Sequence, residues 1–453
     1  MSVPPATAVG VLYDTMLQSA LRQFFDRAAL DAAPVTSPLP DGRLAIEPSA
    51  NPSALIIRWF GTRYTLRVPG RWRFTAHEVR LAQAIGAVLA ARYHAILNPQ
   101  IVAERGDLFR GAIEDRYVGS FLDPRPYAIE SREARADRIA SIIELLRVAA
   151  LSSYENRPIT TGVLLLSTVE DPTRPHRSYQ MPAPAYADSL TAIKSFYRLA
   201  DGVRTLFLAN MEGRLLDVID IARWSGGAAD QPGHAVCAAP YQPHARATAH
   251  QGHVCAVLTP SREIKVFAEG AEVFTFRGAA WHLLDLQAKS RIWTQAVGND
   301  ALAMRIFQTA LDLANAREGA LFLVVRDPTR FVELVAPADR LDVFVPGEPR
   351  ADLAPSRREL LRMLEGRSAT DLDASVFAAL ASLDGATVTD RAGRLLAVGA
   401  ILRHPPLDDT ERHEAVEGAR TTAALAASRF GPVLKVSEDG VITFFDRGRV
   451  WDI

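Results

Sequence analysis

The pattern of hydrophobic and polar residues over the first 150 positions predicts an α+β region. Two short β-rich runs, 54–60 and 64–68, flank a Gly-Thr-Arg tripeptide, which indicates a hairpin. Thr75 is a suitable N-cap for a helix over 76–97, in which apolar residues recur at helical spacing up to an Asn-Pro pair. A second helix is predicted from about 133 to 151. This region is therefore expected to fold around short strands and long helices.

Beyond residue 151 the pattern repeats, because short motifs recur in the same order. The matched pairs are Gly162–Ser167 with Gly319–Val325, Leu199–Val203 with Ser382–Ala386, Gly213–Leu216 with Gly393–Leu396, Ala245–Ala249 with Ala419–Ala423, Val257–Ser261 with Val433–Ser437, and Arg277–Trp281 with Arg447–Trp451. Their order predicts two related α/β units; the alternative is chance similarity between strand–turn–strand segments. Three domains are expected: an N-terminal α+β sensor domain (1–151), a degenerate copy (152–290) and a second copy (300–453).

The composition supports this multidomain prediction and narrows the class of protein. A chain of 453 residues with 48% hydrophobic and 23% charged residues is folded and too long for one ordinary domain. Its 51 basic and 52 acidic residues nearly cancel, so neither a nucleic acid nor a membrane is expected as a partner. Two cysteines cannot form a disulfide framework, and no signal peptide or long apolar run is visible. A cytoplasmic location is therefore expected.

The second copy carries three motifs that resemble those of the diadenylate cyclase family. They follow the predicted helix 300–314 and its strand, and they are Leu383-Asp384-Gly385-Ala386 before a hairpin, Gly418-Ala419-Arg420-Thr421-Thr422 at the head of a helix, and Ser437-Glu438-Asp439-Gly440 after a strand. The resemblance runs from residue 300 to 453 and implies an α/β unit with a mixed central sheet. It also implies condensation of two ATP molecules into cyclic di-AMP, with Mg²⁺ or Mn²⁺ as cofactor.

Phosphoryl transfer of this kind depends on positioning and charge neutralisation, so the resemblance assigns roles to charged residues. Asp384 and Arg420 are the catalytic candidates, with Asp384 on a metal ion and Arg420 on the triphosphate. Glu438 and Asp439 are further candidates for the metal or the phosphates. Val398 to Leu402 would line the adenine pocket. The candidate nucleotide-binding residues are Gly385, Ala386, Val398, Leu402, Gly418, Ala419, Thr421, Thr422 and Ser437.

One departure from the family opens an alternative. The family has His and Arg where this chain has Thr421 and Thr422, which removes positive charge from the expected phosphate site. A catalytically inactive nucleotide-binding sensor is therefore the second hypothesis. A third is a structural or interaction protein, in which Asp384-Gly385 is only a turn and Arg420 a solvated helix residue.

The first copy is expected to be a pseudo-domain. It keeps Asp201-Gly202 and Arg246, but the sequence match puts Arg262 where the second copy has its carboxylate. Diadenylate cyclases need two sites that face each other. The resemblance thus implies pairing of the two units within one chain or pairing in a homodimer.

Two other groups of residues suggest different chemistry. Four histidines and both cysteines fall close together at spacings that could bind zinc, although core and loop roles are favoured: His234, Cys237, His244, His250, His253 and Cys255. Four arginines could indicate a nucleic-acid patch, but neighbouring acidic residues favour a solvated helix face: Arg357, Arg358, Arg362 and Arg367.

Overall fold

The fold was analysed in a computed structural model, which forms two compact units. The first comprises Met1–Val236 and Pro240–Asp285, and the second comprises Cys237–Ala239 and Leu286–Ile453. The structure describes residues 5–25, 27–36, 39, 44–47, 49–68, 72–123, 125, 127, 134–168, 185–186, 194–226, 236–341, 362–403 and 418–453. His234, Arg357 and Arg358 of the sequence predictions lie outside them.

The N-terminal part of the first unit pairs a small antiparallel sheet with helices. The sheet has the order β1-β4-β3-β2, and the predicted hairpin is confirmed as β3 and β4. The predicted helix is confirmed as α2, whose first turn is closed by a capping box between Thr75 and Glu78. The elements are α1 Pro5–Phe24, β1 Ala29–Pro34, β2 Leu44–Glu47, β3 Ala54–Trp59, β4 Thr62–Arg67, α2 Ala76–Leu97, α3 Pro99–Glu104, η2 Gly106–Phe109, α4 Ile113–Leu122 and α5 Arg135–Ala150.

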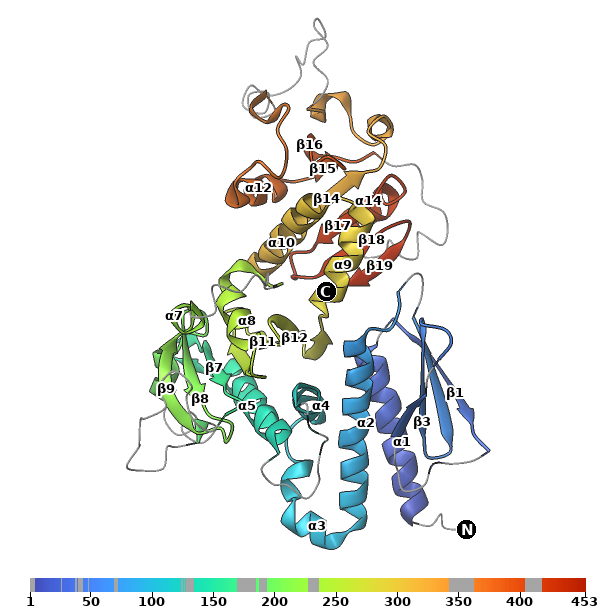
Figure 1. The fold of residues 1–453 in the computed structure, drawn as a ribbon, viewed down its shortest axis with the longest axis vertical. Coiled ribbons are helices and arrows are strands. Elements are labelled where there is room, and N and C mark those ends of the chain that lie inside the picture. Colours follow the sequence, from blue (N-terminus) through green and yellow to red (C-terminus); the bar gives the residue numbers. More distant parts are fainter. Residues whose placement is uncertain are drawn as a thin grey trace, which may run out of the picture. The chain divides into compact units, whose positions relative to one another are not determined.

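The rest of the first unit is a seven-stranded mixed sheet in the order β13-β12-β11-β10-β7-β8-β9 (Figure 1). One hydrophobic core runs from Tyr13 on α1 to Trp281 on β13, so residues on both sides of position 151 share it. The elements are β5 Ser153–Tyr154, β6 Arg157–Pro158, β7 Thr161–Leu165, η3 Lys194–Leu199, β8 Thr205–Ala209, β9 Leu215–Asp220, α7 Ile221–Ser225, η5 Ala239–Tyr241, α8 Gln242–Thr248, β10 Val254–Leu258, β11 Ile264–Ala268, β12 Ala271–Arg277 and β13 Ala280–Leu283.

The second unit is built on a six-stranded mixed sheet in the order β16-β15-β14-β17-β18-β19. Its central strand β14 is buried along its whole length, as expected for a sheet covered on both faces. Leu321, Leu323 and Val325 pack in the core that includes α14, while Phe322 meets Phe377 of α12. The elements are α9 Leu286–Val297, α10 Asp300–Ala316, β14 Ala320–Val325, η6 Arg330–Glu333, η7 Pro337–Asp339, α12 Ala374–Ala381, β15 Ala386–Asp390, β16 Leu395–Ala400, α14 Ala419–Ala427, β17 Val433–Val436, β18 Ile442–Phe445 and β19 Arg449–Asp452.

The two large sheets have the same strand order. The central strand is β7 in the first sheet and β14 in the second. β7 lies between the parallel strand β8 and the antiparallel strand β10, and β14 lies between the parallel strand β15 and the antiparallel strand β17. Even the first hairpin turns agree, because Asn210 and Asp390 each accept a hydrogen bond from the backbone N–H four residues later. The prediction of an α/β protein with mixed sheets is confirmed.

One matched motif lies at different places in the two sheets. Arg277–Trp281 spans the turn between β12 and β13, whereas Arg447–Trp451 spans the turn between β18 and β19. Because β19 is the counterpart of β12 in strand order, the two segments lie one hairpin apart. The sequence match of this pair was therefore wrong.

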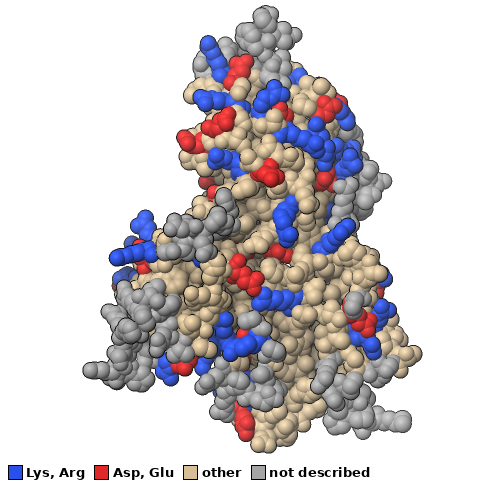
Figure 2. Space-filling model, viewed as in Figure 1, with Lys and Arg blue, Asp and Glu red and all other residues tan. Residues whose placement is uncertain are grey.

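Charge and hydropathy at the surface agree with the composition. Basic and acidic side chains are interspersed over the face seen in Figure 2, in a chain whose formal net charge is −1. Among the described helices, none combines the length and apolarity that a bilayer span requires.

Candidate functional site

The candidate site of the second unit lies at one end of its sheet. Because β14 and β15 are parallel and β17 is antiparallel to β14, the starts of β14 and β15 and the end of β17 share one edge. Asp384 precedes β15, Gly319 precedes β14, and Glu438 follows β17. The sheet topology therefore gathers three segments that are far apart in sequence.

Arg420 joins two of these segments through its guanidinium group. Its Nη1 donates to Oε1 of Glu438 at 2.9 Å, and its Nη2 lies 3.6 Å from Oδ1 of Asp384. Asp384 has a fully exposed side chain and Glu438 is mostly exposed, so both carboxylates are open to solvent. The arginine is also close to the backbone of Gly319, where a Cβ atom would collide with Nη1. The cluster thus consists of one cation between two accessible anions.

Helix α14 places Arg420 in its first turn. Gly418 is the N-cap residue, with a φ of 113°, and no side chain caps the helix. Ala419 and Arg420 follow as the first two helical residues, where backbone N–H groups have no partner within the helix. A helix start of this kind favours negative charge close to Arg420.

Gly385 has a structural reason beside its predicted role. Its φ is 108°, and a Cβ atom there would come within 2.5 Å of the carbonyl carbon of Gly399 and 2.7 Å of the N of Ala400. The glycine therefore lets the turn at Asp384 pack against β16. Ala386 follows as the buried first residue of β15.

The two threonines that replace the family's His and Arg are both engaged within the protein. The buried Thr421 accepts a hydrogen bond at 2.9 Å from Nζ of Lys435, which is itself buried on β17. Thr422 donates its hydroxyl to the carbonyl of Gly418 at 3.2 Å. Lys435 was missed in the sequence, because only the fold brings this strand lysine under the start of α14.

Several predicted residues lie away from the exposed cluster. Val398 and Leu402 are buried, and Leu402 packs in the core around Leu321. Ser437 and Asp439 both hydrogen-bond to Val441 within the β17–β18 turn. The backbone N–H of Ser437 donates to the carbonyl of Val441, and the carboxylate of Asp439 accepts the N–H of Val441.

Two exposed apolar side chains lie near the cluster instead. Leu383 is 41% exposed and Ile401 is 77% exposed. Leu383 directly precedes Asp384, and Ile401 follows Ala400, which pairs with Ala386. Both residues therefore belong to the end of the sheet at which β15 starts, and Ile401 is the exposed member of the predicted range Val398 to Leu402.

The carboxylates of the cluster fit a divalent cation that also binds phosphates. Mg²⁺ is usually held by one or two carboxylates, with water and phosphate oxygens completing its octahedron. Asp384 and Glu438 would supply the carboxylates, whereas Asp439 uses its own in the turn. Within the described residues, no three His, Cys, Asp or Glu side chains are grouped as a protein-only metal site requires.

At the corresponding edge of the first unit, the matching aspartate has a structural role. Asp201 uses Oδ1 to accept three backbone N–H groups, from Val203, Arg204 and Thr205, at 2.7–2.9 Å. Partial burial alone would raise the pKa of this carboxyl, but these N–H groups lower it below its ordinary value. Asp201 therefore closes a turn.

The hairpin hydrogen bonds correct the alignment of the other first-copy residues. The backbone N–H groups of Thr259 and Ser437 each donate to the carbonyl four residues later, so these two residues correspond. Pro260 therefore stands where Glu438 does, and Arg262 corresponds to Gly440. The prediction that Arg262 replaces the carboxylate was wrong by two positions. Arg246 lies in the second turn of α8 and is exposed, unlike Arg420 in the first turn of α14.

Two histidines of the His/Cys group have separate hydrogen-bond partners, and both cysteines are buried. Nε2 of His244 lies 3.0 Å from the carbonyl of Gly202, and His253 accepts a hydrogen bond from the N–H of Ser167. Burial lowers the pKa of both histidines to about 4, which keeps the rings neutral at pH 7. Cys255 is buried on β10, as the sequence predicted, and Cys237 is buried in the second unit.

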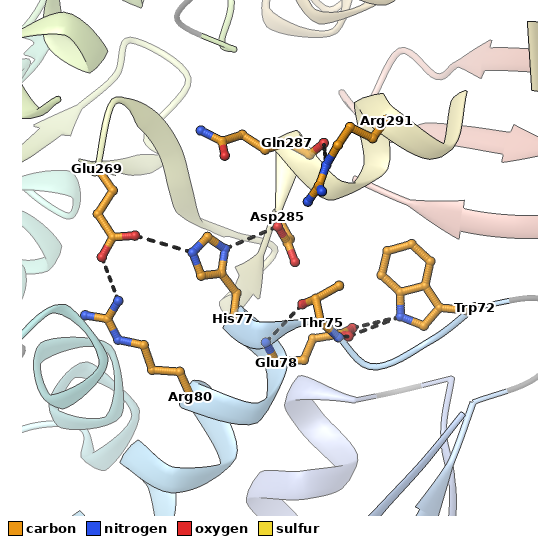
Figure 3. Close-up of polar contacts among 9 residues, drawn as sticks. All are labelled: Trp72, Thr75, His77, Glu78, Arg80, Glu269, Asp285, Gln287 and Arg291. Atoms are coloured by element: carbon orange, nitrogen blue, oxygen red, sulfur yellow. Dashed lines mark hydrogen bonds and ion pairs between the residues drawn. The ribbon is translucent and has the colours of Figure 1, made fainter. Parts of the chain in front are cut away.

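A charged cluster in the first unit was not found in the sequence. His77, at the start of α2, lies between Asp285 (Nδ1 to Oδ1, 3.2 Å) and Glu269 (Nε2 to Oε2, 3.4 Å) (Figure 3). Glu269 also pairs with Arg80 at 2.6 Å. Hydrogen bonds that the imidazole donates to Asp285 and Glu269 raise the pKa of His77 to about 9, and the bond from His77 lowers the pKa of Glu269 to about 2. The cluster ties α2 to the strands of the large sheet.

The comparisons with known proteins leave the family of the chain open. No protein-family model matches it, and no curated protein does. Among solved structures, a hypothetical membrane spanning protein from Bacillus cereus is 18% identical over 36% of this chain and 70% of its own, at a TM-score of 0.26. A double mutant of DacA from Staphylococcus aureus is 18% identical over 33% of this chain and 85% of its own, at a TM-score of 0.20. Scores this low assign neither fold nor activity, so the function must be argued from the site.

Proposed function

We propose that residues 300–453 bind ATP with Mg²⁺ or Mn²⁺ and condense two ATP molecules into cyclic di-AMP. The observation that carries the proposal is the contact of Arg420 with Asp384 and Glu438, which unites the three motifs at one sheet edge. Further support comes from the exposure of both carboxylates, since charged groups without a structural task are those free to serve a ligand.

The proposed binding step is an exchange of partners. A triphosphate would bind to Arg420 and to the backbone N–H groups at the start of α14. The guanidinium group would then no longer pair with Asp384 and Glu438. The two carboxylates would then hold the divalent cation, which supplies charge neutralisation for the phosphates. Leu383 and Ile401 would contact the base. In the reaction two phosphodiester bonds form, two pyrophosphates leave, and each attacking hydroxyl gives up a proton.

The proposal extends to the architecture. We propose that 152–290 and 300–453 arose as copies of one unit, a proposal supported by their common strand order and matching hairpin turns. Because the first copy has Pro260 in place of Glu438 and no arginine at its helix start, an internal pair would contain one equipped site. Cyclisation therefore requires a homodimer in which two second copies face each other, and light scattering of the purified chain tests this.

A second candidate function is nucleotide binding without turnover. It is favoured by the threonines, since Thr421 is buried against Lys435 and Thr422 donates to its own helix. In this case the site would serve as a sensor of ATP or cyclic di-AMP.

The decisive experiment incubates the full chain with ATP and Mn²⁺ or Mg²⁺, followed by chromatography of the products. Calorimetry with ATP and with cyclic di-AMP runs in parallel. Cyclic di-AMP formed by the wild type and lost in Asp384→Asn supports the cyclase, whereas ATP binding without product supports the sensor. If the chain neither forms cyclic di-AMP nor binds a nucleotide, the proposal of a nucleotide site is contradicted.

A further inference from the structure

A pocket in the first unit combines charged side chains from three helical segments. It has a volume of about 530 Å³, which is the size of many small-molecule sites. Its lining comes from the α3–η2 segment, from the loop and helix of α4, and from α5. The polar lining residues are Glu104, Asp107, Arg110, Arg116, Asp137, Arg138 and Ser141.

Two of the carboxylates in this pocket are already neutralised. Asp137 accepts hydrogen bonds from Arg116, from Nη2 of Arg105 at 2.7 Å and from the hydroxyl of Tyr127 at 2.8 Å. Asp107 binds Nε of Arg105 at 3.1 Å. Both arginines of this network are more than nine-tenths buried, so the floor of the pocket is a fixed set of paired charges.

The lining holds two further cations, Arg110 and Arg138. Within the described residues, neither Arg110 nor Arg138 has a hydrogen-bond or ion-pair partner, although both line the pocket. Glu104 is the remaining charged residue of the lining. Among the described residues, its carboxylate accepts a hydrogen bond only from the side-chain amide of Gln100, at 3.5 Å. Two open guanidinium groups over a neutralised floor leave an excess of positive charge that suits an oxyanion.

We propose that this pocket binds a small oxyanion, a carboxylate or a phosphate, through Arg110 and Arg138. Arginine suits this task because its planar group forms two parallel hydrogen bonds with either anion. Glu104 is placed to accept a donor group of the same ligand. The pocket belongs to the first unit, so the proposal stands apart from the nucleotide site of the second unit.

The walls of the pocket connect it to the large sheet of the first unit. On α4, Asp115 accepts hydrogen bonds at 2.9 Å from Trp281 of β13 and from Arg147 of α5. The stem of Arg138 passes within about 4 Å of the place a Cβ atom would take at Gly213, in the β8–β9 turn. Arg138 thus lies beside the turn between β8 and β9 of the same unit.

The test uses the full chain carrying Arg420→Ala, so that phosphate binding in the second unit is weakened at the outset. Inorganic phosphate and citrate are titrated separately by calorimetry, which distinguishes a phosphate site from a carboxylate site. Saturable binding of at least one anion is expected, weakened about tenfold by Arg110→Gln or Arg138→Gln and abolished by the double change. The matched control is Arg246→Gln, an exposed arginine of α8 outside the pocket, which should leave the affinity unchanged.

The outcomes separate cleanly. No saturable binding of either anion, or equal affinity in the double variant and its parent, overturns the proposal. Because Arg110 and Arg138 are at least partly exposed, circular dichroism melts should stay unchanged and confirm that the variants fold. Failure here leaves the ATP experiments untouched, since those measure the unaltered second unit.

Discussion

The same edge of two sheets with one strand order is used in opposite ways. In the first unit Asp201 serves the structure, because its carboxylate closes a turn. In the second unit Asp384 and Glu438 lie in solvent around Arg420. The comparison teaches that an acidic residue next to glycine has no fixed meaning in this fold, because its hydrogen bonds decide its role.

The largest effect is expected from Asp384→Asn. The change keeps the shape and removes the charge that the proposed metal requires, so cyclase activity should fall about 100-fold. The melting temperature should not change, because the side chain is fully exposed. Asp201→Asn is the matched control, since an amide oxygen still accepts the same N–H groups. Equal losses of activity in both variants would show that the two edges are used alike.

Arg420→Ala should weaken ATP binding about 30-fold, because a charged contact to phosphate is lost in the ground state. Calorimetry with ATP measures this, and Arg246→Ala provides the control from the first unit. An unchanged affinity in Arg420→Ala would place the nucleotide elsewhere.

Because of His77, the stability of the first unit is expected to fall as the pH becomes alkaline. Its pKa is raised from 6.5 to about 9 in the folded protein, so its stabilisation is complete below pH 6.5 and is lost as the pH rises through 9. The expected loss is about 2 kcal/mol, seen as a falling melting temperature between pH 7 and 10. His77→Gln should flatten that slope, whereas a slope that survives the change would assign it to another group. His244 and His253 do not interfere, since their pKa values are about 4.

Lys435→Met should lower ATP affinity about tenfold if the buried ammonium adds positive potential under Arg420. Adenosine, which has no phosphate, should bind equally to both proteins. A loss of adenosine binding as well would indicate that Lys435 acts by supporting the fold around Thr421.

The smallest effect is expected from Asp201→Ala, at about 1 kcal/mol of stability, because three N–H groups lose their acceptor and turn to water. Denaturant unfolding measures it. The folded carboxyl has a lowered pKa, so this stabilisation is present above the ordinary pKa and fades as the pH falls through the lowered value. Asp384→Ala should leave the stability unchanged, because its side chain is fully exposed.

Local signals made parts of the fold predictable. Helix α2 was predicted with the bounds that the structure has, because the signal for each end lies next to that end in the sequence. Thr75 of the capping box precedes the helix, and the Asn-Pro pair follows it. The resemblance of three motifs to the diadenylate cyclase family assigned Asp384, Arg420 and Glu438 to one site, and the structure brings the three side chains together. The register of Ser261 was misplaced because Arg262 holds a φ of 63° where the second copy has Gly440. An arginine in that conformation gives no signal in the sequence. The roles of Lys435 and of the pocket arginines were not predicted, because they arise from contacts between segments that are distant in the sequence.

The core shared by α1 and β13 has a consequence for how the chain is made. Trp281 donates its indole N–H to Asp115 and packs in the hydrophobic core that begins at Tyr13. During translation the first unit cannot complete this core until β13 has left the ribosome, whereas the second unit, apart from Cys237–Ala239, consists of residues that emerge afterwards. Nascent chains halted before residue 281 should therefore remain sensitive to protease and dependent on chaperones.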